Sequence, residues 1–182
     1  MEHDGGQDWG VRRAALEDAG RIADLIARSF ADVAEHFALT RANCPSHPSL
    51  TTRDTVERGM TLGTTFLLAF RGSGLCGCVG LRRPVKGVCI LEKLAVAPDC
   101  RRQGLGRRLV GEAFALARQA GAGQVEIGII AKQLELRAWY ESLGFRAVGT
   151  AHFERLPFEV LSLRTLLDEA ARSSADLGQP RR

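Results

Sequence analysis

Residues 94–109 read Leu-Ala-Val-Ala-Pro-Asp-Cys-Arg-Arg-Gln-Gly-Leu-Gly-Arg-Arg-Leu, and this stretch decides the fold. An apolar strand passes through a turn with two glycines, Gly104 and Gly106, into a helix. The first amides of a helix have no intrahelical acceptor and lie at the positive end of the helix dipole, so they attract anions. Because glycine has no side chain, the backbone can approach a phosphate closely there. The stretch therefore predicts a phosphate-binding turn, although two glycines can also serve a tight turn alone.

The familiar nucleotide motifs do not fit this turn. No Gly-Lys-Ser/Thr follows it, as a P-loop would require, and the first expected strand lacks the Gly-rich turn of a dinucleotide fold. Four arginines bracket the turn, and no aromatic residues interleave with them as a nucleic-acid stacking platform would need. These features indicate a different, small phosphate-bearing ligand and no nucleic-acid partner.

Two segments together resemble the GNAT superfamily of N-acetyltransferases. Arg101-x-x-Gly104-x-Gly106 is similar to the family's coenzyme A signature, Arg/Gln-x-x-Gly-x-Gly/Ala. Residues 137–145, Arg-Ala-Trp-Tyr-Glu-Ser-Leu-Gly-Phe, are similar to its second motif, which contains Tyr-Glu-x-x-Gly-Phe. The resemblance covers about 91–145, and before it only the order of elements is similar.

A length of 182 residues fits a single domain spanning 1–182, and periodicity outside the central stretch predicts that it is of the α/β class. The expected sheet is mixed and mostly antiparallel, is flanked by helices, and has a parallel pair at its centre because a helix connects 88–97 to 125–130. The resemblance implies that this pair is splayed. We expect an ordered core over about 9–165 and a polar, fraying tail at 172–182. The expected strands are 9–14, 65–70, 75–82, 88–97, 125–130, 146–154 and 158–163, and the expected helices are 17–37, 52–60, 103–120 and 134–143.

Composition narrows the class of protein further. The chain is 45% hydrophobic and 25% charged, which is typical of a folded protein and not of a disordered one. Its net charge of +4 is too small to indicate nucleic-acid binding. No apolar run approaches the roughly 20 residues of a membrane helix, and five cysteines, an odd number, favour reduced thiols. We therefore expect a cytoplasmic protein with no membrane partner.

The resemblance implies that acetyl-CoA is the co-substrate. It places the pantetheine arm along the backbone of the strand before the turn and the pyrophosphate on the amides of the turn. A lone Cys44-x-x-His47 pair is poor support for zinc, so no metal is expected. The expected coenzyme-binding residues are Leu94, Ala95, Val96, Arg101, Arg102, Gln103, Gly104, Leu105, Gly106, Arg107 and Gln133.

Attack of an amine on a thioester needs a base for the amine and an acid for the leaving thiolate. Tyr140, the only tyrosine, occupies the family position for the acid, although an aromatic residue on an apolar helix face can also be core. Some family members place the base at the position of Gly128, which leaves Glu92 and Glu126, each within an apolar strand, or a water relay. Gly128 fits close approach of a ligand at the splay or, alternatively, a bulge or packing contact.

The acceptor is the open part of the hypothesis. The Pro-containing loop at 39–49, with His36 shortly before it, borders the acceptor site in the family, which makes His36, Cys44 and His47 candidate substrate contacts. We expect transfer to a primary amine, on a small molecule or a peptide, by direct attack in a ternary complex. A non-catalytic acetyl-CoA sensor or partner module, a longer acyl donor and a homodimer remain alternatives to test.

Overall fold

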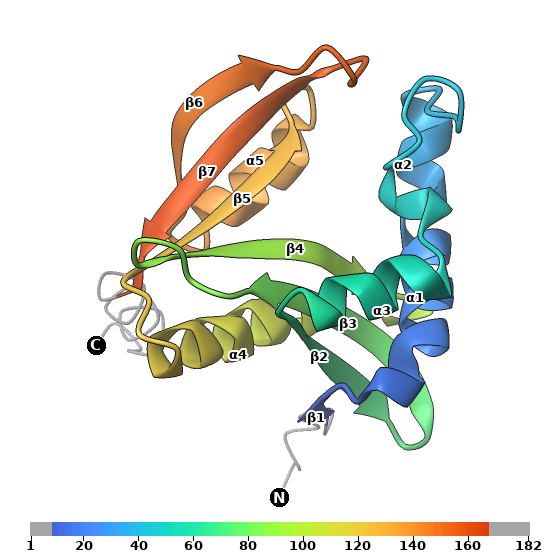
Figure 1. Ribbon diagram of the computed structural model, residues 1–182, viewed down its shortest axis with the longest axis vertical. Coiled ribbons are helices and arrows are strands. Elements are labelled where there is room, and N and C mark those ends of the chain that lie inside the picture. Colours follow the sequence, from blue (N-terminus) through green and yellow to red (C-terminus); the bar gives the residue numbers. More distant parts are fainter. Residues whose placement is uncertain (1–8, 168–182) are drawn as a thin grey trace, which may run out of the picture.

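Seven strands form one mixed sheet in this computed structural model, which describes residues 9–167 (Figure 1). The strand order is β1-β2-β3-β4-β5-β7-β6. The pair β4–β5 is parallel and the other neighbouring pairs are antiparallel, as expected. The expected tail at 172–182 lies outside the described residues. The strands are β1 Gly10–Arg13, β2 Thr64–Arg71, β3 Gly74–Arg82, β4 Val88–Val96, β5 Gln124–Ile130, β6 Arg146–His152 and β7 Glu159–Leu166.

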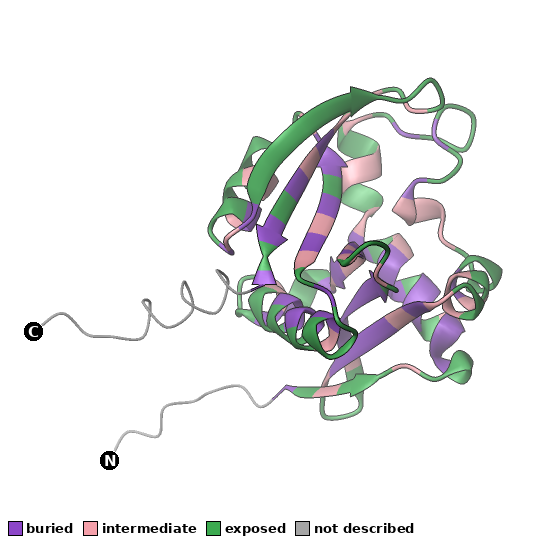
Figure 2. Cartoon of the chain, turned by 60° about the vertical axis from the view of Figure 1, so that its left-hand side comes forward, coloured by how far each residue is buried: buried purple, intermediate pink, exposed green. Residues whose placement is uncertain are grey.

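Helices cover both faces of the β1–β4 half of the sheet. Helices α1 and α3 pack on one face, and α4 packs on the other (Figure 1). Apolar residues of α1 and α4 turn inward at three- and four-residue spacing, and Figure 2 shows the buried positions along the strands and on the inner sides of the helices. The helices are α1 Ala19–Ser29, α2 Ala31–His36, α3 Arg53–Thr61, α4 Leu105–Gln119 and α5 Leu134–Glu141, with short 3-10 turns at Leu16–Asp18, Pro48–Leu50 and Pro98–Cys100.

The helix expected over 17–37 is wrong as a single element. It breaks at Phe30, whose backbone (φ −107°, ψ 4°) leaves the helical region and separates α1 from α2. The three- and four-residue spacing of apolar side chains continues across the break, which is why periodicity alone does not reveal it.

Strands β4 and β5 diverge soon after they begin. Only Val88, Cys89 and Ile90 of β4 pair with β5, and the two strands then separate (Figure 1). The remainder of β4 therefore has no strand partner on that side. This is the splayed central pair that the sequence comparison implied.

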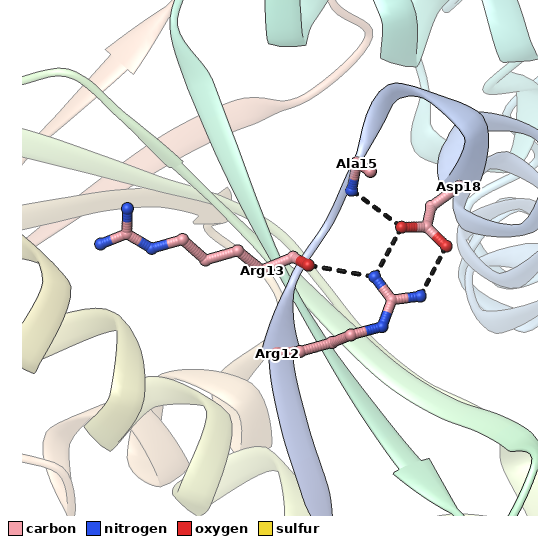
Figure 3. A network of polar contacts seen from close by, with 4 residues as sticks. All are labelled: Arg12, Arg13, Ala15 and Asp18. Carbon is pink, nitrogen blue, oxygen red and sulfur yellow. Dashed lines mark hydrogen bonds and ion pairs between the residues drawn. The ribbon is translucent and has the colours of Figure 1, made fainter.

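A polar network joins β1 to the start of α1 (Figure 3). Both guanidinium nitrogens of Arg12 donate to the Asp18 carboxylate at 2.7 Å, and the backbone N–H of Ala15 donates to the same carboxylate at 2.8 Å. The hydrogen bonds from Arg12 are the main reason that the pKa of Asp18 falls to about 2. The carboxylate thus fixes the turn between the two elements.

Candidate functional site

A cavity of about 940 Å³ lies where β4 and β5 diverge. Its walls come from both halves of the sheet, from the junction of α1 and α2, and from the turn before α4. Four of the expected site residues, Gln103, Glu126, His36 and Cys44, do not line it. The expected residues that do line it are His47, Glu92, Leu94, Ala95, Val96, Arg101, Arg102, Gly104, Leu105, Gly106, Arg107, Gln133 and Tyr140.

Free backbone donors gather at the start of α4. Within residues 9–167, no acceptor is found for the consecutive N–H groups from Arg102 to Arg107. Arg102 (φ +59°) and Gly104 (φ +79°) both have left-handed backbones, which turn successive N–H groups toward one side. For the arginine this conformation costs about 1 kcal/mol. A run of free backbone donors turned to one side can hold an anion of the size of a phosphate.

Arg101 uses its side chain within the protein. Its guanidinium donates to the Val96 carbonyl (3.3 Å), the Asp32 carboxylate (2.7 Å) and the Ser29 carbonyl (2.7 Å). Burial opposes ionisation of Asp32, yet the ion pair with Arg101 holds the pKa of Asp32 below its usual value. Arg101 therefore ties the anion-binding turn to the α1–α2 junction.

The other polar side chains of the turn differ in their roles. The Gln103 amide donates to the Asp99 carbonyl (3.0 Å) and its oxygen accepts from Arg71, so this side chain braces the turn from outside the cavity. Arg107 lines the cavity and donates to the Ser142 hydroxyl at 3.3 Å. Arg102 and Arg107 add positive charge beside the free amides.

Tyr140 is held between aromatic rings on α5. Its ring meets Trp139 (centroids 4.8 Å apart) and Phe145 (5.3 Å) edge to face, and the residue is 3% exposed. No hydrogen bond to its hydroxyl is found in the described part of the chain. Burial raises the pKa of this phenol well above its usual value, which makes the neutral hydroxyl a weaker acid than an exposed tyrosine. The ring is thus part of the core and the residue also lines the cavity.

The two candidate carboxylates are separated by the fold. Glu92 lines the cavity and accepts from Arg82 Nε (2.6 Å) and weakly from the Thr64 hydroxyl (3.4 Å). Glu126 lies outside the cavity and is bound by Arg164 Nη2 at 2.7 Å. Arginines therefore pair with both carboxylates.

Gly128 lines the cavity on β5. A Cβ atom at this position would lie 3.0 Å from Val160 Cγ1, which is tighter than ordinary packing. Close packing against β7 therefore accounts for a glycine here, beside any role in ligand approach.

The three candidate substrate contacts lie in different environments. His36 is exposed on α2, and Cys44 is buried, with its thiol pKa raised by burial. His47 is buried and lines the cavity, with Nδ1 accepting from the Ser49 backbone N–H (3.3 Å). Burial lowers the pKa of His47, so its ring is neutral near pH 7.

Lys93 is a cavity residue that sequence reasoning did not single out as a site. Its backbone (φ +52°) is left-handed at a register shift between β3 and β4, where Cys78 opposes Ala95 but Gly80 opposes Glu92. Consecutive charged residues, Glu92-Lys93, inside an apolar strand were the available signal for this bulge.

The described residues contain neither a candidate metal site nor a candidate membrane-spanning helix. No group of three or more His, Cys, Asp or Glu side chains within 9–167 is placed to hold a metal ion. None of the helices in this range has the length and apolarity needed to cross a bilayer.

Comparison with known proteins places the site in context. The profile of the acetyltransferase (GNAT) family matches residues 30–145, which include the anion-binding turn and Tyr140. No curated protein matches the chain by sequence.

Solved structures share the fold at low identity. The PaiA N-acetyltransferase from Thermoplasma acidophilum, solved in complex with coenzyme A, is 16% identical, with a TM-score of 0.73 over 87% of this chain and 99% of that one. The ribosomal-protein-S18-alanine N-acetyltransferase from Escherichia coli is also 16% identical, with a TM-score of 0.69 over 88% and 94%. A putative GNAT acetyltransferase from Desulfovibrio desulfuricans is 22% identical, with a TM-score of 0.68 over 88% and 99%.

Proposed function

The chain belongs to the acetyltransferase (GNAT) family, and from that premise we propose that it transfers the acetyl group of acetyl-CoA to the nitrogen of a primary amine. The observation that carries the proposal is the run of free amides from Arg102 to Arg107 at one end of a cavity that also contains Tyr140. A phosphate-binding turn and a proton donor in one cavity fit a phosphate-bearing thioester.

The coenzyme would lie along β4 into the splay. The amides from Arg102 to Arg107 would bind the pyrophosphate, with Arg102 and Arg107 adding charge, and Gln133 lines the far wall. The pantetheine arm would pair with Leu94 to Val96, where β4 has no strand partner on the β5 side. Arg101 and Gln103 would then support the turn and not contact phosphate directly.

The chemical step needs two proton transfers. The amine nitrogen attacks the thioester carbonyl carbon, a C–N bond forms, and the C–S bond breaks. Tyr140 would donate a hydrogen bond to the departing thiolate and supply its proton, because it lines the cavity and its hydroxyl is neutral. Glu92, directly or through a water molecule, would take the proton from the amine, since it is the candidate carboxylate that lines the cavity. The ternary complex needs no covalent acetyl-enzyme.

Release of the coenzyme A thiol across a panel of amines and peptides tests this proposal. We expect acceptor-dependent turnover, lowered about tenfold or more in Glu92→Gln, since general acid–base groups contribute at least that much. Glu126→Gln is a matched control, a carboxylate paired with arginine but outside the cavity, and should stay within about twofold of the parent. Acetyl-CoA binding without turnover on any acceptor would favour the alternative, a non-catalytic sensor module.

Three further expectations belong to the proposal. The donor is acetyl-CoA and not a longer acyl-CoA, which competition between donors of increasing chain length tests. No metal takes part, which predicts that chelators leave the rate unchanged. A cytoplasmic location and a homodimer remain predictions, for fractionation and for size-exclusion chromatography with light scattering respectively.

A further inference from the structure

Part of the cavity wall is apolar. Phe30, Val33, Pro48, Ile130 and Phe158 all line it. Three of these, Val33, Ile130 and Phe158, also belong to a small cluster with Leu39 and Cys44. The cluster joins α2 and the loop after it to the end of β5 and the start of β7, so it bridges the two halves of the sheet. This wall can pack against a small apolar group of the acceptor.

Four of the eight charged side chains that line the cavity form two ion pairs. Arg82 pairs with Glu92 (2.6 Å), and Arg101 pairs with Asp32 (2.7 Å). Lys93 lines the cavity and has no ion pair within the described residues 9–167; its ammonium lies 6.0 Å from the centre of the Phe66 ring. The remaining charged lining residues, Arg102, Arg107 and Glu135, come from the turn before α4, from α4 and from α5. Lys93 is therefore the lining cation outside the turn and α4 that has no ion pair within the described residues.

The backbone of Lys93 adds a second observation. A left-handed conformation is strained for lysine, and such strain is found mainly where a side chain must be held in one place. The bulge sets Lys93 between Glu92, the candidate base, and Leu94, where the free edge of β4 continues. Lys93 therefore follows the candidate base directly in the strand, and its ammonium lies toward the Phe66 ring.

His47 supplies a hydrogen-bond donor that lines the same cavity. Its Nδ1 accepts from the Ser49 backbone N–H (3.3 Å) and lies 2.9 Å from the Ser49 hydroxyl, so the proton of the neutral ring is on Nε2. Nε2 has no partner in the described part of the chain. The Lys93 ammonium and the neutral His47 donor can both bind an anionic oxygen. The ammonium would repel a polycationic acceptor, and the His47 N–H offers such an acceptor no hydrogen-bond acceptor atom.

We propose that the acceptor is an amino acid with an apolar side chain, whose carboxylate is bound by Lys93 and by Nε2–H of His47. The inference rests on the proposed function and adds the substrate class to it. The amine would then face Glu92 while the side chain packs on the apolar wall of Phe30, Val33 and Phe158. Lys93 is a specificity-determining residue in this account.

Matched acceptors test the carboxylate. Leucine, methionine and phenylalanine are each compared with their amides and with the amines that lack the carboxyl group. Loss of a hydrogen bond to a charged group should cost about tenfold or more in kcat/KM. We therefore expect Lys93→Gln to lower kcat/KM for the acids about tenfold and for the amides and amines less than about twofold. Comparing variants on one acceptor cancels differences in amine basicity.

Lys132→Gln is the control for loss of a lysine, because Lys132 is exposed and does not line the cavity. It should leave every acceptor unchanged, and Lys93→Arg should restore much of the preference for acids. Glycine should be at least about tenfold worse than leucine if the apolar wall contributes.

Calorimetry with acetyl-CoA distinguishes failure of the proposed function from failure of the proposed acceptor class. If acetyl-CoA does not bind, the proposed function itself fails. If it binds, but the parent prefers the decarboxylated amines, or Lys93→Gln lowers all acceptors equally, the inference about the acceptor is overturned alone. Absence of turnover and of binding by all three amino acids in the presence of coenzyme A would overturn it as well.

Discussion

Tyr140 shows how burial sets the chemistry of one residue. The rings of Trp139 and Phe145 enclose it, and burial raises the pKa of its hydroxyl, so the residue stays a neutral hydrogen-bond donor. A thiolate leaving from the thioester would accept that hydrogen bond as negative charge develops on its sulfur. The same packing makes the ring part of the core, so structural and chemical roles coincide here.

The variant Tyr140→Phe keeps the ring and removes only the hydroxyl. We expect kcat to fall roughly tenfold to a hundredfold, since proton transfer by a positioned acid contributes in that range or above. Affinity for acetyl-CoA and the melting temperature should change little. Steady-state rates at saturating acceptor, with calorimetry for the coenzyme, measure both. A Tyr140→Phe variant as fast as the parent would remove Tyr140 from the mechanism.

Asp18 offers a residue-scale prediction about stability. Its pKa is depressed to about 2, so the folded state binds fewer protons than the unfolded state between about pH 4 and pH 2. The stabilisation is therefore present above pH 4 and is lost as the pH falls through this window. After allowance for solvent screening, Asp18→Asn should cost roughly 1–2 kcal/mol at pH 7 and much less at pH 2.5.

Urea unfolding at pH 7, 4 and 2.5 measures this effect. Asp24→Asn is the control, because Asp24 is exposed on α1 and its replacement should change stability by less than about 0.5 kcal/mol. An Asp18→Asn variant with the same deficit at every pH would show that the charge of Asp18 contributes nothing.

At the scale of elements, the turn into α4 could be predicted from the sequence, and the contact between Arg101 and Asp32 that supports the turn could not. Gly104 and Gly106 lie within one short stretch of the sequence, and the physics of a helix start is local. Arg101 instead contacts Asp32, 69 positions earlier in the chain, and no local pattern indicates this. Likewise the break at Phe30 and the bulge at Lys93 depend on how distant segments pack, which periodicity does not encode.

Gly104 tests whether the shape of the turn matters. Its φ of +79° strains any other residue, although a Cβ atom would meet nothing within 4 Å. We expect Gly104→Ala to cost about 1 kcal/mol of stability and to weaken acetyl-CoA binding. Gly111 lies inside α4 with open space around it, so Gly111→Ala should stabilise the protein by about 1 kcal/mol and leave binding unchanged. Equal effects of the two variants in unfolding and calorimetry would contradict this account.

Arg101 tests the link between the turn and the α1–α2 junction. Both Arg101→Ala and Asp32→Asn should raise KM for the acceptor, because each frees the wall that carries Phe30 and Val33. The double variant should be little worse than Arg101→Ala, with a coupling of about 1 kcal/mol in kcat/KM. Strictly additive effects in the same steady-state measurements would mean that the Arg101–Asp32 ion pair does not couple the turn before α4 to the α1–α2 junction.

At the scale of the whole molecule, two halves of a sheet are joined by a short parallel pairing and by an apolar cluster, with a cavity between them. The mixed sheet could be predicted because the strand–helix–strand order around α4 demands a crossover, and its splayed centre was implied by the family resemblance. Which of the two candidate carboxylates lines the cavity could not be predicted, since Glu92 and Glu126 look alike in the sequence and strand register separates them. A ligand held by both halves should stabilise the molecule as a whole.

Calorimetric titration of the full chain with acetyl-CoA tests the central claim most directly. We predict binding of one acetyl-CoA per chain, weakened by Gly104→Ala and unchanged in Gly111→Ala. Acetyl-CoA at about 100 times its dissociation constant should then add about 2.7 kcal/mol to the free energy of unfolding. No binding by the parent chain, or binding that Gly104→Ala leaves intact, would contradict the assignment of the cavity and its amide turn to the coenzyme.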